Sequence, residues 1–163
     1  MYSASVPAFV RTLTAMLTWL DKAEAHAEAR KFDTANYLGL RLARDMLPLT
    51  RQVQIASDGL KGCVARLAGM EVPQWDDKEA SLDDLRTRIR KTLDFVQSVP
   101  AEKIDGTEGS SVVLAMRAGE MTFTGQSYLL GFVLPNLYFH ATTLYALLRQ
   151  AGVPLGKKDF LGA

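Results

Sequence analysis

The sequence contains one cysteine, Cys63, and two histidines, His26 and His140. A single cysteine excludes an intramolecular disulfide, and it also excludes a zinc site built from several thiolates. The lack of disulfides fits a reducing compartment, so we expect a cytoplasmic protein. No phosphate-binding glycine loop, nucleophile elbow or protease metal motif is present, and the catalytic residues are therefore unknown at this point.

Neither sign of charge dominates, and long apolar runs are missing. The chain has 19 Lys and Arg against 18 Asp and Glu, which leaves a net charge of +1. The basic residues are dispersed, so no nucleic-acid partner is expected. The longest apolar run, residues 128–139, contains Gly131 and Pro135 and is shorter than the roughly 20 residues that cross a membrane. The N-terminus does not resemble a signal peptide. We therefore expect no membrane association.

The length fits a single domain, residues 1–163, with one sizeable core. Apolar residues at three- and four-residue spacing predict four long helices. The predicted helices span residues 6–30, run from near Pro48 to Gly69, follow Ser81 and stop before Pro100, and span residues 125–150. Between the last two, residues 112–124 alternate in polarity around Ala118–Gly119, which predicts a small β-hairpin. The fold class is therefore all-α, a four-helix bundle whose long connections permit crossovers.

The fourth predicted helix is apolar on nearly all sides, and we expect it to be the most buried. Pro135 lies inside it, four residues after Gly131, which predicts a kink and space beside the helix. Asn136, His140 and Thr143 form one polar stripe on this helix. Because unpaired buried polar groups cost about 1–3 kcal/mol each, the stripe needs partners, and the second helix offers Gln52. His26 has acidic neighbours, and we expect it to be solvated.

Several segments resemble an uncharacterised bacterial family, a domain of unknown function in the DinB/YfiT-like superfamily of metalloenzymes. They are SVPAFVRTL, DMLPLTRQVQIASD, ARLAG, TFTGQSYLL and PNLYFHATTLYALLRQAGVPLGKKDFLG. The resemblance covers nearly the whole chain, and its most specific part is residues 135–162. It implies a four-helix bundle with crossover connections, often as a homodimer.

Metal-binding members of that superfamily use three histidines, one on the second helix and two spaced by four on the last. Here His140 matches one of the pair, but Asn136 and Leu144 occupy the positions four residues to either side. The second helix has Gln52 or Gln54 at the remaining position. Amide oxygens carry no charge and bind divalent metals weakly. We therefore expect the fold without the metal site, and no cofactor.

Three functions remain open. The first is a bundle that binds a small polar molecule in a pocket lined by Gln52, Asn136, His140 and Thr143. The second is a metal-dependent or histidine-based hydrolase or transferase, with His140 as general base or as the main metal ligand. The third is a structural homodimer without a catalytic role, to which Met70, Trp75 and the tail residues 160–161 contribute apolar surface.

Overall fold

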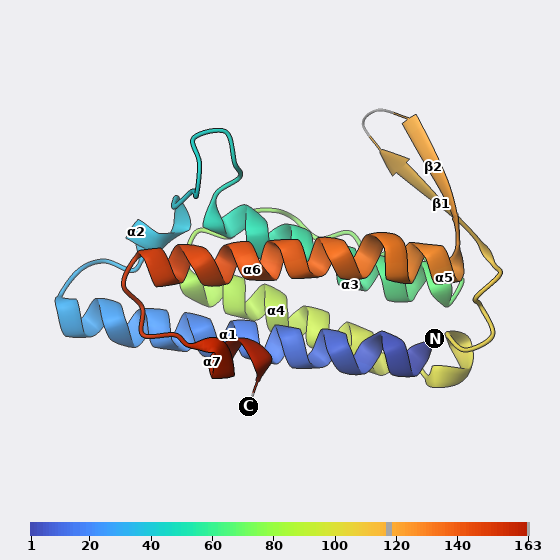
Figure 1. Ribbon diagram of the computed structural model, residues 1–163, viewed down its shortest axis with the longest axis horizontal. Helices are drawn as coiled ribbons and strands as arrows, with labels where there is room; N and C mark the ends of the chain where they lie inside the picture. The colour runs from blue at the N-terminus through green and yellow to red at the C-terminus, as the bar shows by residue number, and fades with distance from the viewer. Residues whose placement is uncertain (117–118, 163) are drawn as a thin grey trace.

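The computed structural model describes residues 1–116 and 119–162, and four long helices form its body (Figure 1). They are α1 (Val6–Arg30), α3 (Leu49–Leu67), α4 (Leu82–Ser98), and a last helix that consists of α5 (Gly125–Tyr128), a π-helical segment (Leu129–Val133) and α6 (Leu134–Gln150). These bounds confirm the four helices that regular apolar spacing predicted. None of the helices described is both long enough and apolar enough to span a membrane.

Of the long helices that follow one another in the chain, only α3 and α4 are neighbours in the bundle. α3 packs against α4 and α6, and α1 packs against the same two helices. α1 and α3 therefore lie diagonally opposite, as do α4 and α6. Figure 1 shows α3 and α4 running in one direction and α1 and α6 in the other. This arrangement confirms the crossover connections, since residues 68–81 must return along the bundle to join two parallel helices.

The predicted hairpin is present and projects from the bundle (Figure 1). β1 (Ser111–Met116) pairs with β2 (Gly119–Thr124) in an antiparallel register, with Val112 opposite Phe123. Val112 is buried at the root of the hairpin, whereas Met121 nearer the tip is exposed. The predicted turn at Ala118–Gly119 includes residue 118, which lies outside the described residues. Short helical turns complete the fold: Tyr2–Ala4, α2 (Ala35–Leu38), Ala101–Lys103 and α7 (Lys157–Leu161).

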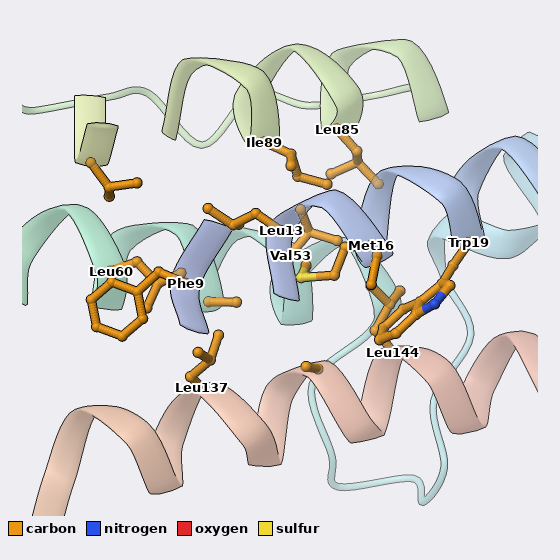
Figure 2. Packing of buried hydrophobic residues seen from close by; sticks show 14 of the residues in the cluster. Phe9, Leu13, Met16, Trp19, Val53, Leu60, Leu85, Ile89, Leu137 and Leu144 are labelled. Carbon is orange, nitrogen blue, oxygen red and sulfur yellow. The ribbon is translucent and has the colours of Figure 1, made fainter. Parts of the chain in front are cut away.

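All four long helices contribute to one apolar core (Figure 2). Its buried side chains include Leu13 and Met16 of α1, Val53 and Leu60 of α3, Leu85 and Ile89 of α4, and Leu137 and Leu144 of α6. Trp19 is fully buried, and its indole N–H donates to the Asp159 carbonyl at 2.9 Å. Phe160 stacks on the indole with 5.5 Å between ring centroids. These two contacts hold α7 against α1.

The last helix has one feature that the sequence did not predict and one that contradicts an expectation. Just before Pro135, where a kink is predicted, lies the π-helical segment, in which the Leu134 N–H donates to the Leu129 carbonyl five residues back. A wider π turn changes the hydrogen-bond register just before proline, which itself cannot donate. The prediction that this helix is the most buried is wrong, because Leu130 and Phe139 are 48% and 55% exposed. Apolar residues surround the helix, but the other helices cover only part of it.

The expectation that His26 is solvated is also wrong. Its side chain is half-buried, and Nδ1 lies 2.7 Å from the hydroxyl of Tyr37. The Tyr37 hydroxyl donates to the Ala23 carbonyl, and therefore His26 donates to Tyr37. Phe32 packs edge-on against the imidazole. His26 thus connects α1 to α2, and the acidic residues next to it in sequence concealed this role.

Candidate functional site

Three polar or small residues of α3 face the last helix at regular intervals. Gln52, Gly59 and Arg66 are spaced by seven, so they return to nearly the same side of α3. Successive members of the set lie about 10 Å apart along the helix axis. Because α3 and α6 run in opposite directions, their partners on the last helix occur in reverse order: His140, Asn136 and Tyr128. We call this line of contacts the α3/α6 seam.

The first contact of the seam joins Gln52 to His140, as the sequence suggested. Oε1 of Gln52 lies 2.7 Å from Nδ1 of His140, and Nε2 of Gln52 donates to the Leu47 carbonyl at 2.8 Å. Because the amide N–H group is bound to Leu47, the oxygen that faces the imidazole accepts, and Nδ1 therefore carries the proton. Nε2 of His140 is then the hydrogen-bond acceptor of a neutral ring. No hydrogen bond to Nε2 is present within the described residues.

Burial favours this neutral ring. His140 is 7% exposed, and removal from water lowers its pKa below the ordinary value of 6.5. Phe139 packs edge-on against the imidazole with 5.1 Å between ring centroids. The ring is therefore held in one orientation by an amide and an aromatic neighbour. It presents an uncharged acceptor at neutral pH.

Of the other two predicted site residues, Asn136 lies on the seam, whereas the hydroxyl of Thr143 is bound within its own helix. Asn136 is half-buried, and its Nδ2 lies 3.6 Å from the position that a Cβ on Gly59 would occupy. Its amide forms no hydrogen bond with another described residue, so it remains available to a ligand. Thr143 is buried and donates to the Phe139 carbonyl of its own helix at 2.8 Å. The hydroxyl of Thr143 is therefore already bound within α6.

Sequence reasoning missed the third contact of the seam. Nη1 of Arg66 donates to the hydroxyl of Tyr128 at 3.1 Å, at the end of α3 nearest the hairpin. Gly62 makes room for this guanidinium, since a Cβ there would collide with Nη1. The seven-residue spacing from Gln52 through Gly59 to Arg66 was the signal in the sequence. This spacing indicates a line of contacts only once the helix that α3 faces is known.

The seam does not supply the donors of the metal site that the resemblance implies. Gln52 Oε1 is occupied by the His140 ring, and the other predicted residues offer only amide or hydroxyl groups. Across residues 1–116 and 119–162, no three His, Cys, Asp or Glu side chains are grouped as metal ligands. Burial also raises the pKa of the Cys63 thiol to about 12, which keeps the metal-binding thiolate form scarce. The residues present do not fit the family's metal.

Two surface cavities lie away from these predicted residues. One, of about 290 Å³, lies beside Trp75 on the returning segment, and the other, of about 360 Å³, lies between α1 and α7. Lys61 and Lys91 place their ammonium groups 4.1 and 4.7 Å from the Trp75 ring centroid. Arg88, next to this ring, is buried and forms ion pairs with Asp58, Asp77 and Glu79. These contacts fix the returning segment, residues 68–81, on α3 and α4.

Comparisons with known proteins agree with this architecture. Residues 1–161 match the sequence profile of a family described as a domain of unknown function, DUF1993. A crystal structure of a DinB family member protein from Shewanella denitrificans superposes with a TM-score of 0.91 at 39% sequence identity. The match covers 99% of this chain and 92% of that one. No curated protein matches the chain. The chain therefore belongs to the DUF1993 family and has a DinB-like fold.

Proposed function

We propose that the protein binds a small polar molecule at the α3/α6 seam, where Nε2 of His140 accepts a hydrogen bond from an O–H or N–H group of the ligand. The observation that carries the proposal is the fixed imidazole, with Nδ1 bound to Gln52 and Gln52 bound in turn to Leu47. Asn136, one turn away on α6, adds an amide that can donate and accept. Preorganised polar groups among apolar walls are typical of ligand sites.

A hydrolase or transferase at this position has less support. A general base needs a proton to remove within hydrogen-bond reach and a second group that completes the reaction. Within the described part of the chain, His140 has no carboxylate or thiolate partner, and burial lowers its pKa, which weakens it as a base. A single imidazole beside amides suits recognition better than proton transfer.

The test is a ligand-detected NMR screen of small alcohols and primary amides, with acetamide and propane-1,2-diol as defined probes. We expect binding by the wild-type protein that His140→Ala abolishes and Gln52→Leu weakens, because leucine no longer holds the ring. Thr142→Ala, an exposed position on the same helix, is the matched control and should bind as the wild type does. Equal binding by His140→Ala and the wild type would show that the site is elsewhere.

A second candidate role, a homodimer, is favoured by a different observation. The last helix carries no charged residue from Gly125 to Leu148, and Leu130, Tyr138 and Phe139 are exposed on it. An uncharged apolar face fits a second copy of itself around a two-fold axis. Figure 1 shows the 39–48 loop and the hairpin projecting from one side of the bundle, and both carry further exposed apolar residues, Leu47 and Met121. Sedimentation velocity tests this role, and a monomer at all concentrations would exclude it.

A further inference from the structure

Arg66 lacks the ion pairs that the two buried arginines of the described residues form. Arg86 and Arg88 each form ion pairs with three carboxylates. Arg66 is half-buried, yet its guanidinium forms no ion pair with any described carboxylate. A partly buried charge without a counter-charge is unfavourable unless something else compensates it. An anionic ligand would supply the missing charge.

The guanidinium is held in a defined place. It lies over Gly62 and donates from Nη1 to the Tyr128 hydroxyl, which is 2% exposed. This phenol has no acceptor for its own proton among the described residues. Burial raises the pKa of Tyr128, so the phenol stays protonated and remains a donor. The remaining guanidinium donors and the phenol proton together form a site that prefers an acceptor, and an anionic one above all.

The surroundings of this pair are aromatic and irregular. Phe123 and Phe132 are half-buried, and their ring centroids lie 5.7 and 6.1 Å from that of Tyr128. The π-helical segment begins directly after Tyr128, and such segments are frequent at functional sites. The site around Arg66 therefore combines a cation that lacks a counter-charge with the apolar surface of two phenylalanine rings. A metal ion or an inorganic phosphate would make no use of that apolar surface.

We propose that Arg66 binds the carboxylate of a small organic acid whose apolar body lies against Phe123 and Phe132. A planar guanidinium matches a carboxylate with two parallel hydrogen bonds. The site is separate from the one at His140, because Gln52 and Arg66 are about 21 Å apart along α3. Failure at either site thus leaves the other proposal intact.

The test is a titration of the protein with benzoate, followed through the side-chain Nε–Hε signals of arginine by NMR. We expect benzoate to shift the Arg66 signal, and Arg66→Gln to weaken binding about tenfold or more, since the two charged hydrogen bonds are lost. Tyr128→Phe should weaken binding as well, because the guanidinium is no longer held. Benzamide, which has the same shape without the charge, and inorganic phosphate, which lacks the apolar body, should bind more weakly than benzoate. Arg90→Gln removes an exposed positive charge from α4 and should bind benzoate as the wild type does.

Gly62→Ala provides a variant that keeps every charge. The added methyl group displaces the guanidinium, while alanine favours the helix more than glycine does. We therefore expect an unfolding midpoint no lower than that of the wild type, together with weaker benzoate binding. Benzoate binding by Arg66→Gln equal to that of the wild type, or no binding by the wild type, would overturn the proposal. So would a loss of dimers in Arg66→Gln without benzoate binding, which would identify a carboxylate of a second copy as the counter-charge.

Discussion

The His140 side chain links the stability of the protein to pH. Its pKa is lowered by burial, so below pH 6.5 the unfolded chain binds a proton that the folded chain does not. The contribution of the neutral ring is therefore complete above pH 6.5 and is lost as the pH falls below it. We predict that the free energy of unfolding, measured by urea denaturation, falls more between pH 7.5 and pH 5 for the wild type than for His140→Gln.

Between pH 7.5 and pH 5, the effect of His140 on stability can be distinguished from that of the carboxylates. Burial opposes ionisation of Glu79, but hydrogen bonds from Arg88 and Gln54 outweigh it and lower the pKa of Glu79 below 4.5. The stability contributed by that carboxylate is lost only at lower pH. Parallel pH profiles for the wild type and His140→Gln between pH 7.5 and pH 5 would contradict the neutral, buried ring.

At the scale of elements, the ion pairs of Arg88 attach the returning segment 68–81 to the bundle. Arg88 is 4% exposed and also donates to the Asp76 carbonyl at 3.2 Å. Removing one partner of a buried ion pair costs about 3–5 kcal/mol. Of the three carboxylates, only Glu79 is largely buried, at 11% exposed, whereas water can hydrate Asp58 and Asp77. We therefore predict a loss near the lower end of that range for Arg88→Met in urea unfolding. Arg90→Met, an exposed position on the same helix, should change stability by no more than about 0.5 kcal/mol.

Element by element, the sequence predicted what local periodicity determines. The Val6–Arg30 helix and the hairpin followed from apolar spacing of three to four and of two. The π-helical segment did not, because its hydrogen bonds shift by one residue without changing which side chains are apolar. The exposure of Phe139 was missed for a related reason. Composition shows that a helix is apolar, and only its neighbours decide which part of it is covered.

The candidate site depends on how the elements pair across the whole molecule. Gln52 and His140 were predicted as partners because a buried polar stripe needs one, and the structure joins them at 2.7 Å. Arg66 and Tyr128 are 62 positions apart, and both this contact and that of Gln52 with His140 form only if α3 runs antiparallel to the last helix. Long crossover connections leave that pairing undetermined by local sequence. On α6, Tyr138 and Phe139 form an apolar face that the other helices leave uncovered.

That uncovered face leads to a prediction for the molecule as a whole. If a second copy covers Phe139, only the folded chain can bind it, and dimerisation then stabilises the fold by mass action. The thermal midpoint should therefore rise with protein concentration for the wild type in calorimetry. Phe139→Glu should remove this dependence, because a charge in the apolar contact opposes pairing while an exposed position tolerates it in the monomer. Ala25→Glu, which adds the same charge at an exposed position of α1, should keep it. A midpoint independent of concentration in all three proteins would mean that α6 faces water.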